Sequence, residues 1–192
     1  MKFSYAMLPD YPLEESLRAI KLADELGFYA VYAADETWHK DLWLLFAAAS
    51  QQTSQIRMGP SLSGVVLREP SLIAQSAATL DELTGGRAEV VLGSGNFGLL
   101  AEYKIDWRET KPLSRVVEGV HVVRTLLDEG TITFDGEFFR YDGLFTFARG
   151  EVRVNAEGVS SLERDDHGPH RVVVDLDTAA VAKEILRRIC GV

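Results

Sequence analysis

Two short segments of this 192-residue sequence combine residue types that could perform chemistry. In residues 35–39 (DETWH), two carboxylates precede an imidazole, which titrates near neutral pH and could donate a proton or order a substrate. Residues 93–98 (GSGNFG) have the spacing G-x-G-x-x-G, which holds a pyrophosphate in dinucleotide-binding folds. The same glycines could instead end one strand of a larger barrel.

The residues that follow Gly98 argue against a dinucleotide-binding fold. That fold needs a complete helix directly after the glycines and an acidic residue about 20 positions later. Here residues 99–104 are followed by Ile105, Asp106 and Trp107 and then by Pro112, which is too little for a crossover helix. We therefore interpret the glycine spacing as accidental and keep a nucleotide-binding open sheet as a third interpretation.

A third group, near the carboxyl end, contains the residue types of a metal site: Asp165, Asp166, His167 and His170. Metal ligands usually have a fixed spacing on one element, whereas these residues lie in a polar run. The sequence therefore predicts solvated charge there and no metal.

Strand-like and helix-like segments alternate through the first 130 residues. Strands are predicted for residues 2–7, 30–34, 56–58 and 88–92, and helices for residues 11–26, 42–53, 70–83 and 116–127. Asp10 and Asp41 are placed to cap helices, while Gly27 and Gly130 are placed to end them. Repeated strand-helix units with short links require parallel strands, in an open doubly wound sheet or in a barrel.

A β-hairpin is predicted for residues 131–140 (TITFDGEFFR). Asp135-Gly136 stands between alternating apolar residues, which is a strong signal for a two-residue turn. We expect this hairpin to cover part of the core.

Charge and cysteine content exclude several classes of protein. Acidic residues outnumber basic ones by 29 to 20 and no cluster of Lys and Arg occurs, which argues against a nucleic-acid-binding or anionic-membrane surface. Cys190 is the only cysteine, so we expect no disulfide framework and a reducing, cytoplasmic location. No signal peptide and no apolar run of about 18 residues is found, so no membrane span is predicted.

Four features together resemble the luciferase-like monooxygenase superfamily, most closely its methylenetetrahydromethanopterin reductase-like branch. They are residues 32–39 (YAADETWH), Met58-Gly-Pro60 leading to Arg68-Glu-Pro70, residues 78–87 (ATLDELTGGR) and the glycine-rich segment from Gly93. The resemblance covers about residues 1–147, the amino-terminal half of a barrel. It implies an α/β fold that is a partial, incomplete TIM-type (β/α) barrel of four to five units with a β-hairpin excursion.

The resemblance also implies a cofactor, FMN or the 8-hydroxy-5-deazaflavin coenzyme F420, bound at the carboxyl ends of the strands. Asp35 would contact its ring, a bulge at Ser61-Leu62 that often contains a non-prolyl cis peptide would back it, and glycines would let the backbone approach. The implied cofactor-binding residues are Asp35, Ser61, Leu62, Ser63, Gly93, Ser94, Gly95 and Asn96.

Two residues are candidates for catalysis. Glu36 stands where many relatives carry histidine, and His39 could donate a proton near the ring. The residues alone leave plainer alternatives open: Asp35 as the cap of a loop or of the next helix, Glu36 as a solvated carboxylate and His39 as a surface histidine.

The implied activity is hydride transfer between deazaflavin or FMN and a small organic substrate, or oxygen activation by reduced FMN. We also expect a homodimer formed through helices 42–53 and 70–83. The competing interpretation is a non-catalytic flavin-binding or dimerisation remnant.

The last 42 residues do not resemble the family. We divide the chain into a partial barrel, 1–150, and a divergent tail, 151–192, with a polar loop over 151–170, a strand over 171–176 and a helix that Asp177 caps. A complete barrel takes about 250 residues. The sequence is therefore expected to be truncated, with the tail either genuine or the product of a frameshift, and enzyme activity is left open.

Overall fold

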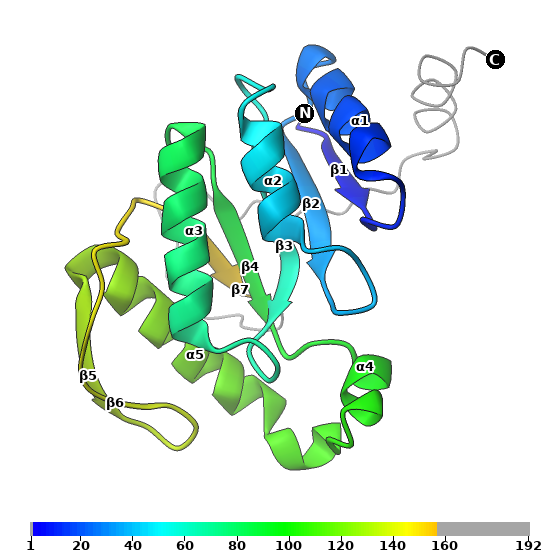
Figure 1. The fold of residues 1–192 in the computed structure, drawn as a ribbon. Coiled ribbons are helices and arrows are strands. Elements are labelled where there is room, and N and C mark those ends of the chain that lie inside the picture. Colours follow the sequence, from blue (N-terminus) through cyan, green and yellow to red (C-terminus); the bar gives the residue numbers. More distant parts are fainter. Residues whose placement is uncertain (1, 157–192) are drawn as a thin grey trace.

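A five-stranded parallel sheet organises the computed structural model, which describes residues 2–156. Its strands neighbour one another in the order β1 (Ser4–Met7), β2 (Ala30–Asp35), β3 (Arg57–Gly64), β4 (Glu89–Gly93) and β7 (Arg153–Ala156). Figure 1 shows α1 (Leu13–Glu25), α2 (Leu42–Ser50) and α3 (Pro70–Thr84) on one face of the sheet. A dinucleotide-binding sheet reverses its strand order and carries helices on both faces. This arrangement confirms the partial barrel.

The core lies between the sheet and these helices. Ile20, Val31, Phe46, Met58 and Ile73 are completely buried there. The strands and helices were predicted from the spacing of such apolar residues along the sequence. Within residues 2–156, no helix is long and apolar enough to span a lipid bilayer.

Most helix boundaries follow the predicted signals. The helix predicted over residues 42–53 ends at Ser50, and the helix predicted over residues 116–127 runs from Pro112 to Glu129. Asp41 caps α2 by accepting a hydrogen bond from the amide of Leu44 at 3.0 Å. Gly85 and Gly130 end their helices in the left-handed conformation, with φ of 67° and 73°. The predicted cap of α1 is wrong: its N-cap position is Pro12, and no side chain caps it.

The segment after β4 contains only short helices before the next long one. α4 (Phe97–Glu102) has six residues and is followed by the 3-10 helix η1 (Trp107–Thr110). α5 (Pro112–Glu129) then packs against α3. As predicted, no crossover helix follows the glycine-rich segment directly.

The hairpin is present, but its predicted two-residue turn is wrong. β5 (Thr131–Asp135) pairs with β6 (Arg140–Phe145), and Asp135 lies opposite Arg140, so residues 136–139 form the connection. The cause is Glu118 of α5, whose carboxylate accepts hydrogen bonds from three successive amides of this connection. These amides belong to Glu137, Phe138 and Phe139, at 2.9, 3.0 and 3.3 Å.

The fifth strand, β7, lies within the segment 151–170 that was predicted as a loop. It pairs in parallel with β4, with Arg153 opposite Glu89. Only Val154 of its four residues is buried, so the strand lacks a recognisable apolar pattern. The predicted strand over 171–176, the helix after it and the candidate metal ligands lie outside the described residues, and the division at residue 150 stays a prediction.

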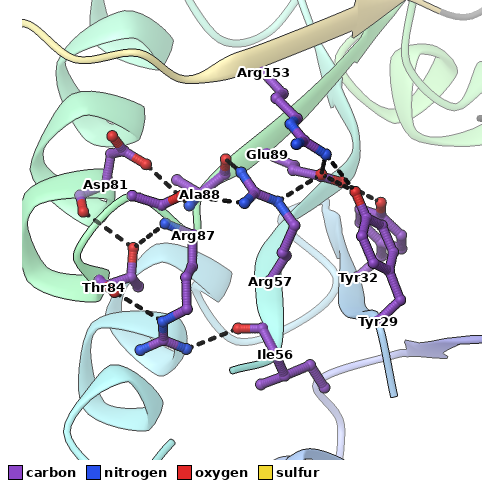
Figure 2. Close-up of polar contacts among 11 residues, drawn as sticks. Tyr29, Tyr32, Ile56, Arg57, Asp81, Thr84, Arg87, Ala88, Glu89 and Arg153 are labelled. Carbon is purple, nitrogen blue, oxygen red and sulfur yellow. Dashed lines mark hydrogen bonds and ion pairs between the residues drawn. The ribbon is translucent and has the colours of Figure 1, made fainter. Parts of the chain in front are cut away.

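A buried carboxylate joins the amino ends of four strands (Figure 2). Glu89 is 3% exposed, and its oxygens accept hydrogen bonds from the hydroxyls of Tyr29 and Tyr32, both at 2.6 Å. The guanidinium groups of Arg57 and Arg153 pair with it at 2.6 and 3.3 Å. Burial, followed by the hydrogen bond to Glu89, raises the pKa of Tyr29 to about 12, so this hydroxyl stays a donor. We call these five residues the Glu89 cluster.

The signature segment 78–87 also lies at the amino ends of the strands (Figure 2). The carboxylate of Asp81 accepts a hydrogen bond from the amide of Ala88 at 3.1 Å, and the hydroxyl of Thr84 accepts one from the amide of Arg87 at 3.1 Å. The Arg87 side chain donates to the carbonyls of Thr84 and Ile56, both at 2.7 Å. The segment therefore closes the link between α3 and β4.

The Glu89 cluster predicts a large effect of a small substitution. Glu89→Gln removes the buried charge that pairs with Arg57, which is 15% exposed, and with Arg153, which is 41% exposed. Breaking a buried ion pair costs about 3–5 kcal/mol. We expect urea unfolding to show a loss of this size. Asp135→Asn is the control, because it also removes a carboxylate that pairs with an arginine, Arg140, but the Asp135 side chain is 90% exposed. Equal effects of the two substitutions would contradict a structural role of the cluster.

Asp24 predicts a pH dependence of stability. Burial alone would raise the pKa of Asp24, but hydrogen bonds from the amides of Ser54, Ile56 and Gln55 lower it below the ordinary value of 3.8. Stabilisation by Asp24 is therefore complete above that value and is lost as the pH falls below it.

We expect Asp24→Asn to lower the urea midpoint near neutral pH, and the difference from wild type to shrink below about pH 3.8. Asp142→Asn, at an exposed position of β6, serves as the control and should leave the midpoint unchanged. A difference for Asp24→Asn that is constant with pH would refute the assignment.

Candidate functional site at the carboxyl ends of the strands

The three loops that the sequence predicts to converge lie at one end of the sheet. Asp35 is opposite Ser63 in the register of β2 and β3, and Gly64 is opposite Gly93 in that of β3 and β4. The hydroxyl of Ser63 donates a hydrogen bond to the Asp35 carboxylate at 2.5 Å. We call Asp35, residues 61–64 and Gly93 the carboxyl rim. It is the end of the sheet opposite the Glu89 cluster, and α4 lies beside it in Figure 1.

Backbone irregularity is concentrated in β3 at this rim. The peptide bond between Ser61 and Leu62 is cis, which confirms the expectation from the family resemblance. The register of β3 shifts here against both of its neighbours. The side chains of Leu62 and Ser63 consequently face different surroundings from those that a regular strand would give them.

Glycines allow the rim strands to approach one another. A Cβ atom on Gly93 would lie 2.5 Å from the side chain of Leu62, and one on Gly64 would lie 2.9 Å from the Cα of Gly95. Glycine at position 64 is therefore required by the nearby backbone, whereas a side chain at position 93 would have to displace Leu62. The predicted contact of Gly93 with a cofactor stays a prediction. Ser94 lies in the link between β4 and α4 and is partly buried.

Asp35 is held by side chains of the protein itself. Its carboxylate accepts a hydrogen bond from the indole of Trp43 at 3.3 Å and lies 3.7 Å from the guanidinium of Arg68. Arg68 in turn stacks over the Trp43 ring at 5.5 Å. Asp35 does not cap α2, because Asp41 does. It instead links β2 to the irregular part of β3, and sequence reasoning missed Arg68 and Trp43 as its partners.

A hollow of about 190 Å3 lies beside the rim. Small and apolar side chains form most of its wall, so a flat ring could lie against them, and Ser61 supplies a polar group. The lining residues are Ala6, Met7, Leu8, Tyr32, Ala33, Ala34 and Ser61.

The two catalytic candidates lie together in the link between β2 and α2. The Nε2 atom of His39 is 3.4 Å from a carboxylate oxygen of Glu36, and its Nδ1 atom is 2.5 Å from a carboxylate oxygen of Asp10. The imidazole is 10% exposed and the Glu36 side chain 20% exposed, so neither is an ordinary surface group. Asp10 was missed as a site residue because its position suggested a helix cap.

The links after β2 and β4 pack against each other. The Trp38 indole donates a hydrogen bond to Glu102 at 2.8 Å, and its ring lies against Gly98. Asn96 caps α4, since its side-chain oxygen accepts a hydrogen bond from the amide of Gly98 at 2.9 Å. Its predicted contact with a cofactor stays a prediction.

Comparison with known proteins identifies relatives of this arrangement. The family model of the luciferase-like monooxygenases matches residues 1–163. A 5,10-methylenetetrahydromethanopterin reductase from Archaeoglobus fulgidus is 29% identical over 166 residues, which cover 85% of this chain and 49% of that protein.

Two solved structures resemble the fold. The coenzyme F420-dependent tetrahydromethanopterin reductase from Methanopyrus kandleri has a TM-score of 0.74 at 21% identity, over 81% of this chain and 49% of that one. The monooxygenase RslO1 from Streptomyces bottropensis has a TM-score of 0.72 at 27% identity, over 81% of this chain and 53% of that one.

The chain thus spans about half the length of the curated relatives it matches. The matching region contains all five strands of the sheet and the whole carboxyl rim. With a family model that covers residues 1–163, the chain belongs to the luciferase-like monooxygenase family.

Proposed function

We propose that this chain supplies the ring-binding half of a flavin-type oxidoreductase that uses coenzyme F420 or FMN. The observation that carries the proposal is the carboxyl rim: Asp35, residues 61–64 and Gly93 meet beside an apolar hollow. Barrel enzymes place their chemistry at this end of the strands, because the loops there vary without disturbing the packed strands.

The residues present fit a flat, largely apolar ring. Ala6, Ala33 and Ala34 leave space at the ends of β1 and β2, and Ser61 adds a polar group to the same hollow. The network of Ser63, Asp35 and Arg68 would hold the irregular part of β3 in position against the ring. When bound, the cofactor would supply hydride transfer or oxygen activation.

Among the protein's own groups, Glu36 and His39 would hold or move a proton close to the rim. Hydride transfer to or from a hydroxyl, carbonyl or imine carbon of a small substrate is accompanied by transfer of a proton. A carboxylate and an imidazole at 3.4 Å are suited to that transfer. The similarity to the Archaeoglobus fulgidus reductase favours a reduction, and a 31% identity over 144 residues to an F420-dependent glucose-6-phosphate dehydrogenase from Kineococcus radiotolerans favours hydride transfer with coenzyme F420.

FMN-dependent monooxygenation is the second candidate. The family to which the chain belongs and the 27% identity to a Streptomyces monooxygenase favour it. Both candidates place the ring at the same rim, so they differ in cofactor rather than in the residues that hold it. We propose a cytoplasmic location for either activity.

We also propose that the chain pairs with a second copy through α2 and α3. An open groove of about 680 Å3 lies between these helices and the end of the hairpin. Leu44 and Phe147, which line it, are 73% and 92% exposed, and Leu83 adds a further apolar side chain. Surface of this kind is usually covered by another protein. A dimer that binds no cofactor would instead support a non-catalytic remnant.

Cofactor binding is tested by fluorescence titration of the purified chain with coenzyme F420, FMN and NAD. We expect quenching by F420 or FMN and no change with NAD. Ser63→Ala should weaken this binding about tenfold, because a hydrogen bond to a charged group contributes about 1.5 kcal/mol or more.

The matched control is Ser50→Ala, which removes another buried hydroxyl, bonded to the carbonyl of Ala47 at the far end of α2. It should leave cofactor affinity unchanged. Binding of NAD alone would favour the nucleotide-binding interpretation, and equal affinity of wild type and Ser63→Ala would remove the rim from the proposal.

Pairing is tested by sedimentation velocity of Leu44→Glu. A charge in an apolar interface is costly, so we expect the variant to be monomeric while wild type is dimeric. Val117→Glu places the same charge at an exposed apolar position of α5, away from the groove, and should remain dimeric. A dimer of unchanged stability in Leu44→Glu would rule out this interface.

A further inference from the structure

The imidazole of His39 is held between two carboxylates that come from different links. Asp10 belongs to the link between β1 and α1, and Glu36 and His39 belong to the link between β2 and α2. One carboxylate faces each ring nitrogen, Asp10 at Nδ1 and Glu36 at Nε2. Each ring nitrogen of His39 therefore has a carboxylate as its neighbour. The Asp10 side chain is 56% exposed to solvent.

The backbone keeps these two links in register. The amide of His39 donates a hydrogen bond to the carbonyl of Glu36 at 3.0 Å. The ammonium group of Lys40 donates to the carbonyl of Asp10 at 2.8 Å, and the Lys40 amide donates to the carbonyl of Pro9 at 3.4 Å. The two hydrogen bonds from Lys40 therefore hold Asp10 in place beside His39.

Within residues 2–156, Asp10 has no side-chain hydrogen bond other than the one with His39. It precedes α1 as a capping residue would, yet α1 has no side-chain cap. Its side chain contacts His39, and the carbonyl of the same residue receives Lys40. The Asp10 carboxylate does not cap the adjacent helix and instead binds an imidazole 29 positions along the chain. Its role is therefore sought in its effect on that imidazole.

We propose that Asp10 is a positioning residue that keeps neutral His39 as the Nδ1-H tautomer, with Nε2 directed at Glu36 as a proton acceptor. The inference rests on the proposed function, since it concerns the proton that accompanies hydride transfer. A carboxylate at one ring nitrogen fixes the proton there and leaves the lone pair on the other.

The proton balance of this arrangement is closed for an alcohol substrate. The C-H hydride of the substrate leaves with its electron pair to the cofactor, and the O-H proton passes to the Glu36 carboxylate, which gives a carbonyl product. Glu36 then passes its proton to Nε2 of His39. The imidazolium that results lies between two carboxylates. It then releases the Nε2 proton to solvent on the side of Glu36, whose side chain is 20% exposed, which restores the Nδ1-H form. Reduction of a carbonyl runs the same steps in reverse.

The test is the tautomer of neutral His39, read from long-range nitrogen-15 NMR spectra of the whole chain above the titration range of the imidazole. His39→Gln assigns the signal by its disappearance. We expect the Nδ1-H form in wild type and in Asp10→Asn, whose amide oxygen still accepts the proton. In Asp10→Ala we expect the Nε2-H form, because Glu36 is then the only carboxylate within reach.

The same tautomer in wild type and Asp10→Ala would overturn the proposal. His121, which packs on Phe134 at 4.9 Å and lies far along the chain in α5, reports in the same spectra that the variant is folded. Rescue by Asn and not by Ala separates positioning of the imidazole from a structural role, since both substitutions remove the charge.

Turnover provides the second measurement. If the chain binds the cofactor and turns over an alcohol, Glu36→Gln should lower kcat about 100-fold, the usual contribution of a general base, and Asp10→Ala should lower it less. Unchanged kcat in both variants would also overturn the proposal. If no cofactor binds, the proposed function fails while the tautomer still decides the role of Asp10.

Discussion

One buried carboxylate determines how the strands of this sheet meet. Glu89, at the start of β4, accepts hydrogen bonds or ion pairs from Tyr29, Tyr32, Arg57 and Arg153, which come from the amino ends of three other strands. A buried carboxylate is costly unless its partners are in place, so these strand ends must assemble together. The parallel register of β7 on β4, with Arg153 opposite Glu89, is the visible result.

The irregular part of the sheet lies at the end opposite the Glu89 cluster. The carboxyl rim contains a cis peptide, two register shifts and a close backbone approach at Gly64, where a Cβ atom would lie 2.9 Å from the Cα of Gly95. The register shifts interrupt regular strand pairing. The segment 78–87, one of the four features that made the family recognisable, lies at the amino ends of the strands and not in the site. Recognition of the family therefore rests partly on residues outside its site.

Local signals predicted most of the helices, and contacts distant in sequence account for the errors. Asp41 caps α2 as expected, because a cap depends on neighbouring residues. Asp10 has the same chemistry but binds His39. The hairpin turn differs from the prediction because its amides bind Glu118. The strand β7 was not recognised in the sequence because Arg153 belongs to an ionic cluster and not to an apolar core. In each case a charged side chain met a partner that no local pattern reveals.

The candidate site also combines positions that the sequence predicted with contacts that it did not predict. Sequence resemblance placed Asp35, Ser61 and Gly93 at one rim, and the register of the strands brings them there. It could not assign Asp35 its partners, since Trp43 and Arg68 reach it from α2 and from the link before α3. All of these groups lie within the half of the relatives' length that the chain spans. The residues predicted to contact the cofactor ring therefore all lie in the described part of the chain, and ring binding can be tested separately from whatever the remaining length contributes in the relatives.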